Sequence, residues 1–384
     1  MKKLNKEKLC SVLSERLEEN IKSNKTAGTD LLVMQSGEVL CHLVKGYRNY
    51  ANNEILEPNS MFRLASMTKP ITGVAVLIGV QNGWFNLDDR LGDYLPEFSD
   101  MAIGKLEKDG SYISDHKAKN DILVYQCLSH CNGILPETEL GDAILNNAPR
   151  SAFDSIDSML AFASKEPLGF EPGTYTAYTG YTSFDAMAKI IEMKSGMKYS
   201  EFLQKNLFDP LDIHDITFHP TEEQWSRMVS LHDRSVAQTL ITVDMGREIF
   251  EGFGPDYECA GACLTSTIED YAKIGELLLN HGTYRGIKIL EPEMVEEMKK
   301  PRVPDGIPGR EPNDSWGLGV RVKVHEDWLP EGTFGWSGAY GTHFWVDHKN
   351  EIMAIMLRGM RWYDTHGAGN MGIEFEKDVM SCLE

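Results

Sequence analysis

The chain has 384 residues, of which 42% are hydrophobic and 25% charged, a composition typical of a globular protein with one large or two interleaved domains. Its formal net charge of −20 makes it repel phosphate backbones and anionic lipid surfaces, so we expect neither nucleic acid nor membranes as partners. No stretch of the sequence approaches the roughly 20 apolar residues of a membrane span.

The N-terminal segment, residues 1–24, predicts an amphipathic helix, because Leu9, Leu13 and Leu17 recur at helical spacing among lysines and glutamates. The segment lacks the continuous apolar core of an export signal. The seven cysteines are an odd number in a large chain, and Cys127–Cys131 and Cys259–Cys263 lack the two-residue gap of common zinc pairs. We therefore expect a cytoplasmic protein with reduced thiols.

Two strands are predicted next, at 31–35 and 38–45, joined in a hairpin through Ser36-Gly37. The sequence Phe62-Arg63-Leu64-Ala65-Ser66-Met67-Thr68-Lys69 then opens an apolar helix that ends near Asn82-Gly83. Residues at i and i+3 share one helix face, so the amine of Lys69 can reach the hydroxyl of Ser66.

Ser66 and Lys69 together suit nucleophilic catalysis. A serine hydroxyl is a weak nucleophile until a base removes its proton, and an amine shielded from water can serve as that base. Free N–H groups at the start of a helix would stabilise an oxyanion. The alternative is a helix cap at Ser66 and a surface lysine at position 69, although a cation in the first turn opposes the helix dipole.

The same Ser-x-x-Lys spacing occurs at Ser114–Lys117 and at Ser195–Lys198. The first pair lies in a polar stretch typical of a loop. The second contains Gly196 and is typical of a helix end with a glycine cap. Only Ser66 opens a long apolar helix, so this serine is the candidate nucleophile.

The chain is predicted to be mostly helical from the Ser66 helix to about residue 264, with helices at 155–164, 182–193 and 199–206 and polar loops around 100–121 and 133–150. The remaining predicted elements are a helix at 267–280, strands at 317–324, 333–337, 342–347 and 351–357, and a last helix at about 366–382.

Three motifs in this order carry a family resemblance: Ser66–Lys69, then Glu171-Pro172-Gly173-Thr174-Tyr175-Thr176-Ala177-Tyr178-Thr179-Gly180, then Phe334-Gly335-Trp336-Ser337-Gly338-Ala339. Together they resemble the serine β-lactamase and penicillin-binding-protein superfamily, and most closely its class C branch, which includes β-lactamase-like carboxylesterases and acyltransferases. The resemblance covers about residues 5 to 383, with weaker matches at 87–91, 128–133 and 260–267. His130 and His343 lie in matched segments and are expected to be structural hydrogen bonders.

The resemblance implies that Ser66 is acylated, that Lys69 is its partner and that Tyr178 matches the family's Tyr-x-Asn tyrosine. A phenol beside cationic or hydrogen-bonding groups can act as a base and then return the proton to the leaving alcohol. Tyr175 and Tyr181 lie nearby, but the spacing from Pro172-Gly173 favours Tyr178. Whether the lysine or the tyrosine is the working base stays open here. By resemblance, the N–H groups of Ser66 and Ala339 form the oxyanion hole.

Two positions depart from the family pattern. Gly180 stands where Tyr-x-Asn has its asparagine, and Trp336 stands where the Lys-Thr-Gly strand has its lysine. A pocket formed by Gly180, Trp336, Ser337 and Gly338 would lack the group that attracts a substrate carboxylate, while tryptophan adds an apolar face with one N–H donor. We therefore expect neutral, apolar acyl groups to bind better than anionic β-lactams.

The segment 335–339 also nearly matches Gly-x-Ser-x-Gly, the nucleophile elbow of α/β-hydrolases. That elbow leads from a strand into a helix, whereas residues 340–346 form an aromatic and β-branched run typical of a strand. The context therefore argues against Ser337 as the nucleophile.

These patterns predict an α+β fold of the β-lactamase type, in which an antiparallel sheet is flanked by helices. Residues 1–84 and 265–384 would form the sheet domain, residues 85–264 an inserted helical domain, and the site would lie in the cleft between them. The expected function is a serine hydrolase that cleaves small neutral carboxylic esters, with acyl transfer where water is excluded. The alternatives are a weak β-lactamase or D-amino-acid peptidase, and a non-catalytic binding or sensor homologue. We expect no cofactor and no metal site, and the sequence leaves the oligomeric state open.

Overall fold

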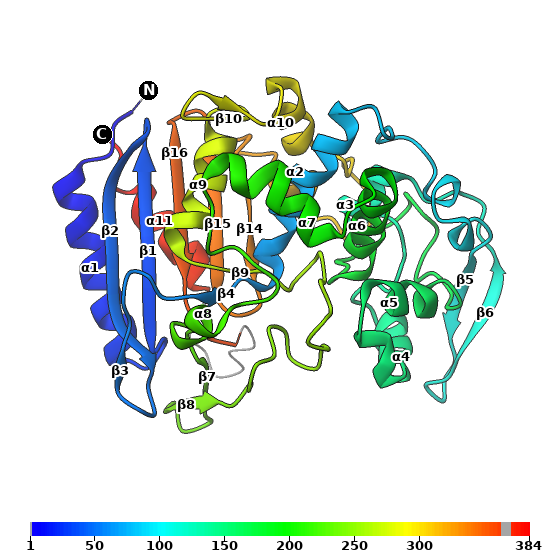
Figure 1. Cartoon of the computed structure of the whole chain (residues 1–384), viewed down its shortest axis with the longest axis horizontal. Coiled ribbons are helices and arrows are strands. Elements are labelled where there is room, and N and C mark those ends of the chain that lie inside the picture. Colours follow the sequence, from blue (N-terminus) through cyan, green and yellow to red (C-terminus); the bar gives the residue numbers. More distant parts are fainter. Residues whose placement is uncertain (1, 362–369) are drawn as a thin grey trace.

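The computed structural model describes residues 2–361 and 370–384, and an eight-stranded antiparallel sheet runs through it (Figure 1). In spatial order the strands are β12 (Asp314–Trp316), β13 (Arg321–Lys323), β14 (Phe334–Gly338), β15 (Thr342–Asp347), β16 (Ile352–Leu357), β1 (Gly28–Gln35), β2 (Glu38–Asn49) and β3 (Glu54–Ile55). Strand β16 pairs with β1 in a register that runs from Leu357 opposite Asp30 to Ile352 opposite Gln35. The two ends of the chain therefore meet in one sheet, as the sequence predicts.

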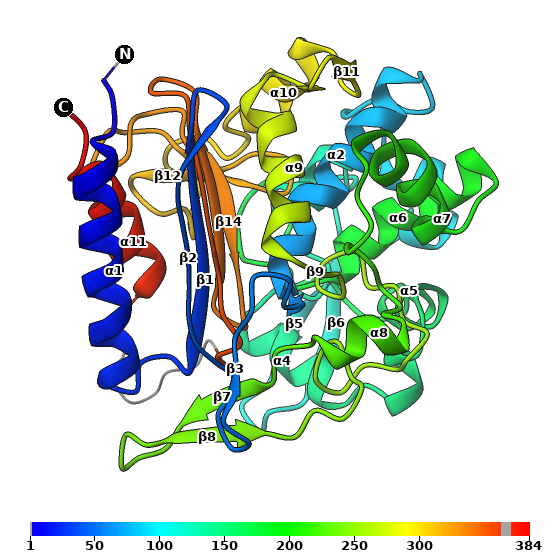
Figure 2. The same ribbon diagram turned by 60° about the vertical axis from the view of Figure 1, so that its left-hand side comes forward.

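Helices cover both faces of this sheet (Figure 2). Leu31 and Val33 of β1 pack in one apolar cluster with α1 (Lys6–Lys22) and α11 (Met371–Met380). Leu32 and Met34, which alternate with them, pack in the main core with α2 (Thr68–Gln81) and α9 (Ile268–Leu279). Successive side chains of a strand point to opposite faces, so every residue of β1 is buried although the strand separates two layers of helices.

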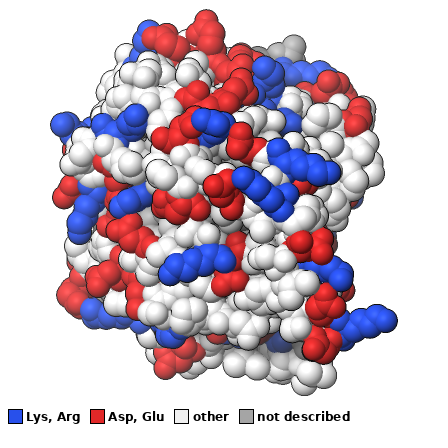
Figure 3. Space-filling view, turned by 90° about the vertical axis from the view of Figure 1, so that its right-hand side faces the viewer, with Lys and Arg blue, Asp and Glu red and all other residues white. Residues whose placement is uncertain are grey.

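Much of the rest of the chain lies to one side of the sheet (Figure 1). Its helices are α3 (Val124–Leu128), α4 (Glu139–Asn146), α5 (Ile156–Ala163), α6 (Thr182–Ser195), α7 (Tyr199–Leu203) and α8 (Glu222–Ser226). Figure 3 shows this side of the surface, where acidic and basic side chains are interspersed. The fold class is the α+β arrangement predicted, while the division into two domains and the expected partners stay predictions.

Several segments of this region differ from the sequence prediction. The loop predicted around 100–121 contains a hairpin of β5 (Ala102–Leu106) and β6 (Tyr112–Lys117), and α4 lies within the loop predicted at 133–150. The largely helical middle also holds the hairpin of β7 (Leu231–Arg234) and β8 (Leu240–Val243). Most of β6 is exposed, so it lacks the alternation of apolar and polar residues that reveals a strand. Ser114 therefore lies in a strand instead of a loop.

Other elements differ at their ends. Only 321–323 of the strand predicted at 317–324 is extended in the sheet, because residues 317–320 form the turn from β12. The helix predicted at 199–206 is α7 followed by a π-helical turn, Gln204–Phe208. The last helix begins at Met371, and residues 366–369 of the predicted span lie outside the described residues. Helix α10 (Pro292–Lys299) and the hairpin of β10 (Thr283–Tyr284) and β11 (Ile287–Lys288) were not predicted. Gly196 caps α6 with a left-handed φ of 70°, as expected.

Each of the seven cysteines is free, and all but Cys10 are buried. This agrees with the reduced thiols expected from the sequence. Within the described ranges, none of the helices combines the length and the apolar character needed to cross a bilayer. The cytoplasmic location stays a prediction.

Helix α11 is tied to the sheet by the buried carboxylate of Glu376. Its oxygens accept hydrogen bonds from Arg321 (2.6 Å) and Trp328 (2.7 Å) and lie 3.0 Å from Nε2 of His343. The other ring nitrogen of His343 lies 2.8 Å from Oγ of Ser337. Burial alone would raise the pKa of Glu376, but these three partners outweigh it and hold the pKa at about 2.

The low pKa predicts a particular loss of stability in acid. A carboxylate whose pKa is lower in the folded state stabilises the fold above its unfolded pKa, and this contribution disappears as the pH falls toward 2. The variant Glu376→Gln should lose about 3 kcal/mol of unfolding free energy at pH 7, the equivalent of lowering the pKa from 4.5 to about 2. Urea unfolding from pH 7 down to pH 2 measures this, with the exposed Glu331→Gln as control. A deficit that stays constant over that range would contradict the assignment.

Candidate active site

Ser66 lies in a single 3₁₀ turn, Ala65–Met67, directly before α2. The residue before it, Ala65, has a φ of 47°, in the left-handed region that side chains other than glycine rarely adopt. The hydroxyl of Thr342 donates to the carbonyl of Leu64 (2.8 Å) and so ties this turn to the sheet. Ala65 and Met67 are buried while Ser66 is partly exposed, so the turn presents the serine at the surface of the core.

The ammonium group of Lys69 is buried and surrounded by acceptors. Its Nζ donates to Oγ of Ser66 (3.3 Å), to the carbonyl oxygen of Gly261 (2.9 Å) and to that of Gly180. An ammonium has three N–H bonds, and each of them has an acceptor here. A buried charge is tolerated only when it is paired or hydrogen-bonded, so this geometry suits the protonated lysine.

The two carbonyls reach the lysine because the chain is very close-packed at Gly261. A Cβ atom at this position would lie 2.6 Å from the oxygen of Gly180 and 2.7 Å from Cα of Tyr181. Both distances are below any ordinary contact, so a side chain here would push the two segments apart. The sequence marked 260–267 as a weak match to the family but did not identify the carbonyl of Gly261 as a ligand of Lys69.

Of the three tyrosines near Pro172-Gly173, the structure brings Tyr178 to Lys69. Its ring centroid lies 4.8 Å from Nζ, and its hydroxyl oxygen accepts a hydrogen bond from Nε1 of Trp336 (3.1 Å). Tyr175 is exposed and packs on Phe170. Tyr181, at the start of α6, packs on Phe253.

His130 holds the loop that carries Tyr178. Its carbonyl accepts hydrogen bonds from the N–H of Ala177 and the hydroxyl of Thr176, both 3.2 Å long, and its Nδ1 accepts the N–H of Thr179 (3.0 Å). Burial and the charge of Lys69 lower the pKa of His130 well below its ordinary value, so the ring is neutral. The structural role expected for this histidine is therefore met by contacts on both sides of Tyr178.

Two tryptophans form an aromatic wall beside Tyr178. The ring of Trp336 lies 5.5 Å from that of Tyr178, and Trp316 of β12 lies 4.5 Å from Trp336. Trp316 also packs on His130, with centroids 4.2 Å apart. Both tryptophans are partly exposed. Trp316 is missing from the sequence prediction because it belongs to no motif and reaches the site only through the pairing of β12 with β13.

Three further residues predicted at the site, Ser337, Gly338 and Ala339, lie on β14 and in the turn after it, and each has different neighbours. The side chain of Ser337 points toward His343 and α11, because it alternates with Trp336 along the strand. Its hydroxyl is therefore not brought to Tyr178. Gly338 packs against the turn before Ser66, since a Cβ there would lie 2.1 Å from the oxygen of Leu64. Ala339 follows directly and packs against a small apolar cluster that contains Ala65.

Comparison with known proteins identifies the family of the chain. A model of the family described as Beta-lactamase matches residues 13–359. The chain is 24% identical over 360 residues to a putative D-alanyl-D-alanine carboxypeptidase of Salmonella typhimurium, a match that covers 86% of this chain and 78% of that protein. It is 26% identical over 324 residues to lovastatin esterase of Penicillium rubens, with 76% and 77% covered.

The fold is also that of a solved structure, a mutant of simvastatin synthase (LovD) from Aspergillus terreus. The two superpose with a TM-score of 0.80 over 97% of each chain, at 21% sequence identity. A likeness at this level of identity concerns the fold.

Proposed function

The chain belongs to the Beta-lactamase family, which makes it a serine hydrolase at the level of the family, and we propose that it cleaves small neutral carboxylic esters through an acyl-enzyme on Ser66. The observation that carries the proposal is the hydrogen bond from Nζ of Lys69 to Oγ of Ser66, 3.3 Å long, beside the ring of Tyr178. A partly exposed hydroxyl, with a cation that contacts both it and the ring of a tyrosine, suits acyl transfer to a serine.

In this proposal Tyr178 is the base. Three acceptors surround Nζ of Lys69, one for each N–H bond of an ammonium, so the proposal gives the lysine the role of a cation. The hydroxyl oxygen of Tyr178 accepts a hydrogen bond from Nε1 of Trp336, and its ring lies 4.8 Å from Nζ of Lys69, so we assign the role of proton acceptor to this oxygen.

The reaction then runs in two halves. Tyr178 takes the hydroxyl proton while Oγ of Ser66 bonds to the ester carbonyl carbon, and the N–H groups of Ser66 and Ala339 stabilise the oxyanion. The intermediate collapses, the bond to the alcohol breaks, and Tyr178 returns its proton to the leaving oxygen. In the second half, Tyr178 takes a proton from water, which attacks the acyl carbon. The bond to Oγ of Ser66 breaks, Oγ regains its proton and the carboxylic acid is released. An alcohol or amine in place of water would give acyl transfer.

The preference for neutral substrates rests on what surrounds the site. Trp336 and Trp316 offer aromatic faces, which suit apolar acyl groups. The carboxylate of Glu137 is exposed at the edge of the site, and its Oε1 would lie 3.8 Å from a Cβ atom at Gly180. A negative charge at this edge disfavours substrates that carry a carboxylate.

The base assignment predicts a specific pattern of kinetics. Tyr178→Phe and Lys69→Ala should each lower kcat by roughly 10²–10⁴, the usual scale of general base catalysis. Their combination should cost much less than the product of the two, because the residues act as a unit. Steady-state hydrolysis of p-nitrophenyl acetate measures this, with Tyr175→Phe from the same loop as the matched control. A Tyr178→Phe enzyme with near-normal kcat would move the role to another group.

The substrate class is tested by a screen of p-nitrophenyl esters of graded chain length alongside nitrocefin and a D-Ala-D-Ala peptide. Short neutral esters should be turned over far better than the two anionic substrates, and Ser66→Ala should abolish every activity. Trp336→Lys should shift the ratio of kcat/KM toward nitrocefin by roughly ten- to hundredfold, the worth of one charged hydrogen bond.

Equal turnover of nitrocefin and esters by the natural protein would favour a β-lactamase, and preferential cleavage of the peptide a D-amino-acid peptidase of the kind named for the Salmonella relative. Failure to hydrolyse any of them, or to react with a fluorophosphonate, would favour a non-catalytic homologue.

A further inference from the structure

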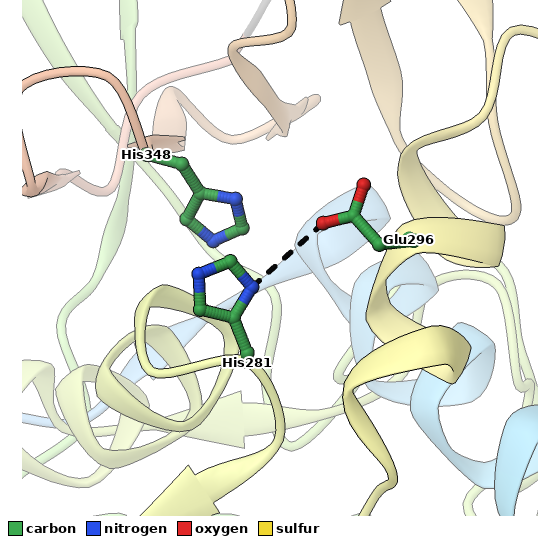
Figure 4. Close-up of side chains that lie close together, drawn as sticks. All are labelled: His281, Glu296 and His348. Atoms are coloured by element: carbon green, nitrogen blue, oxygen red, sulfur yellow. Dashed lines mark ion pairs between the residues drawn. The ribbon is translucent and has the colours of Figure 1, made fainter.

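Three potential metal ligands from separate elements lie close together (Figure 4). His281 follows the end of α9, Glu296 lies in α10 and His348 directly follows β15. One ligand atom of each lies within 4.8 Å of those of the other two. We propose that His281, Glu296 and His348 bind one divalent transition-metal ion, with Zn²⁺ as the leading candidate.

The ligand atoms are oriented toward one another. Nδ1 of His281 lies 3.7 Å from Oε1 of Glu296, and the rings of His281 and His348 pack with centroids 4.2 Å apart (Figure 4). Nε2 of His348 lies 3.0 Å from the carbonyl oxygen of Leu278, to which it donates as N–H. This contact leaves the lone pair on Nδ1, and a backbone carbonyl that fixes the tautomer is a usual partner of a metal-binding histidine.

A cation is already held at this place. Nζ of Lys299 lies 3.0 Å from Oε1 of Glu296 and 3.3 Å from Nδ1 of His348. The ammonium thus contacts two of the three proposed ligand atoms, so these atoms converge on one position that favours positive charge. Lys299 lies on the same helix as Glu296, and its side chain can turn toward solvent when a metal ion takes its place.

The donor set indicates the class of metal. Two imidazole nitrogens and one carboxylate oxygen suit Zn²⁺, Ni²⁺ or Cu²⁺, whereas Mg²⁺ and Ca²⁺ prefer sites made of oxygen. His281 and Glu296 are exposed, so water can complete the coordination. Positions 281, 296 and 348 form no local motif, which is why the sequence led us to expect no metal.

The site would brace α10 against α9 and the turn after β15. Helix α10 in turn packs on α2, since Cε of Met298 would lie 3.1 Å from a Cβ atom at Gly73. The carbonyl of Met298 also accepts the N–H of Leu318 (2.8 Å). A metal ion that joins these elements should stabilise the packing of α10 against α2, the helix that carries Lys69. The three ligands are not part of the candidate active site.

The test is a titration of the full-length protein, first stripped with EDTA, with ZnCl₂ in competition with a chromophoric chelator. We expect one equivalent to bind and the Tm to rise, with EDTA reversing the shift. Glu296→Gln and His281→Ala should each weaken binding by at least about tenfold. The exposed His325→Ala, outside the cluster, should bind as the natural protein does. Lys299→Met should bind roughly two- to fivefold more tightly, because it removes a competing cation.

Zn²⁺ binding that is absent from the natural protein, or equal in His281→Ala and His325→Ala, would overturn the proposal. Equal binding of Mg²⁺ and Zn²⁺ would also overturn it. Circular dichroism of each variant checks the fold, and Glu296→Gln and His281→Ala decide the outcome because both alter exposed side chains.

Discussion

The candidate site depends on one interaction, the burial of the Lys69 ammonium among three acceptors. These acceptors come from three separate parts of the chain: the turn at Ser66, the loop at Gly180 and the loop at Gly261. Leaving a buried charge without partners costs several kcal/mol, so the three segments must meet for the protein to fold well. The same requirement therefore brings the proposed nucleophile, the cation and the phenol together, so in the proposed function stability and catalysis depend on the same contacts.

The sheet and His130 fix the positions of the Ser66 turn and of the loop that carries Tyr178. Strand β14 ends against the turn before Ser66, where Gly338 allows the close approach to Leu64. On the other side, His130 holds the backbone of residues 176, 177 and 179 and leaves the side chain of Tyr178 free to lie over Lys69. Trp336 links the sheet to the loop of Tyr178, because it lies on β14 and its Nε1 donates to the tyrosine hydroxyl. In the proposed function Trp336 stands where the family motif has a lysine, so the site favours neutral substrates, while its N–H donates to the proposed base.

The parts of this arrangement that could be predicted are those with a local signature. The spacing of Ser66 and Lys69, the Pro-Gly turn before Tyr178 and the apolar strands β1, β15 and β16 are all visible in short windows of sequence. The carbonyl of Gly261 and the ring of Trp316 were missed, because backbone ligands and aromatic packing depend on contacts between distant segments. Hairpins such as β5–β6 were missed because their exposed strands carry no apolar alternation. The side chain of Ser337 was expected at the site, but strand alternation turns it toward His343.

The central claim is that Ser66 carries the acyl group, and mass spectrometry of the quenched enzyme tests it most directly. The protein is mixed with an excess of a slowly hydrolysed p-nitrophenyl ester, quenched in acid, digested and mapped. The account predicts a mass increase of one acyl group, located on the peptide that contains Ser66 and absent from Ser66→Ala. An acyl group on Ser337 or Ser195, or steady turnover with no modified peptide, would contradict it.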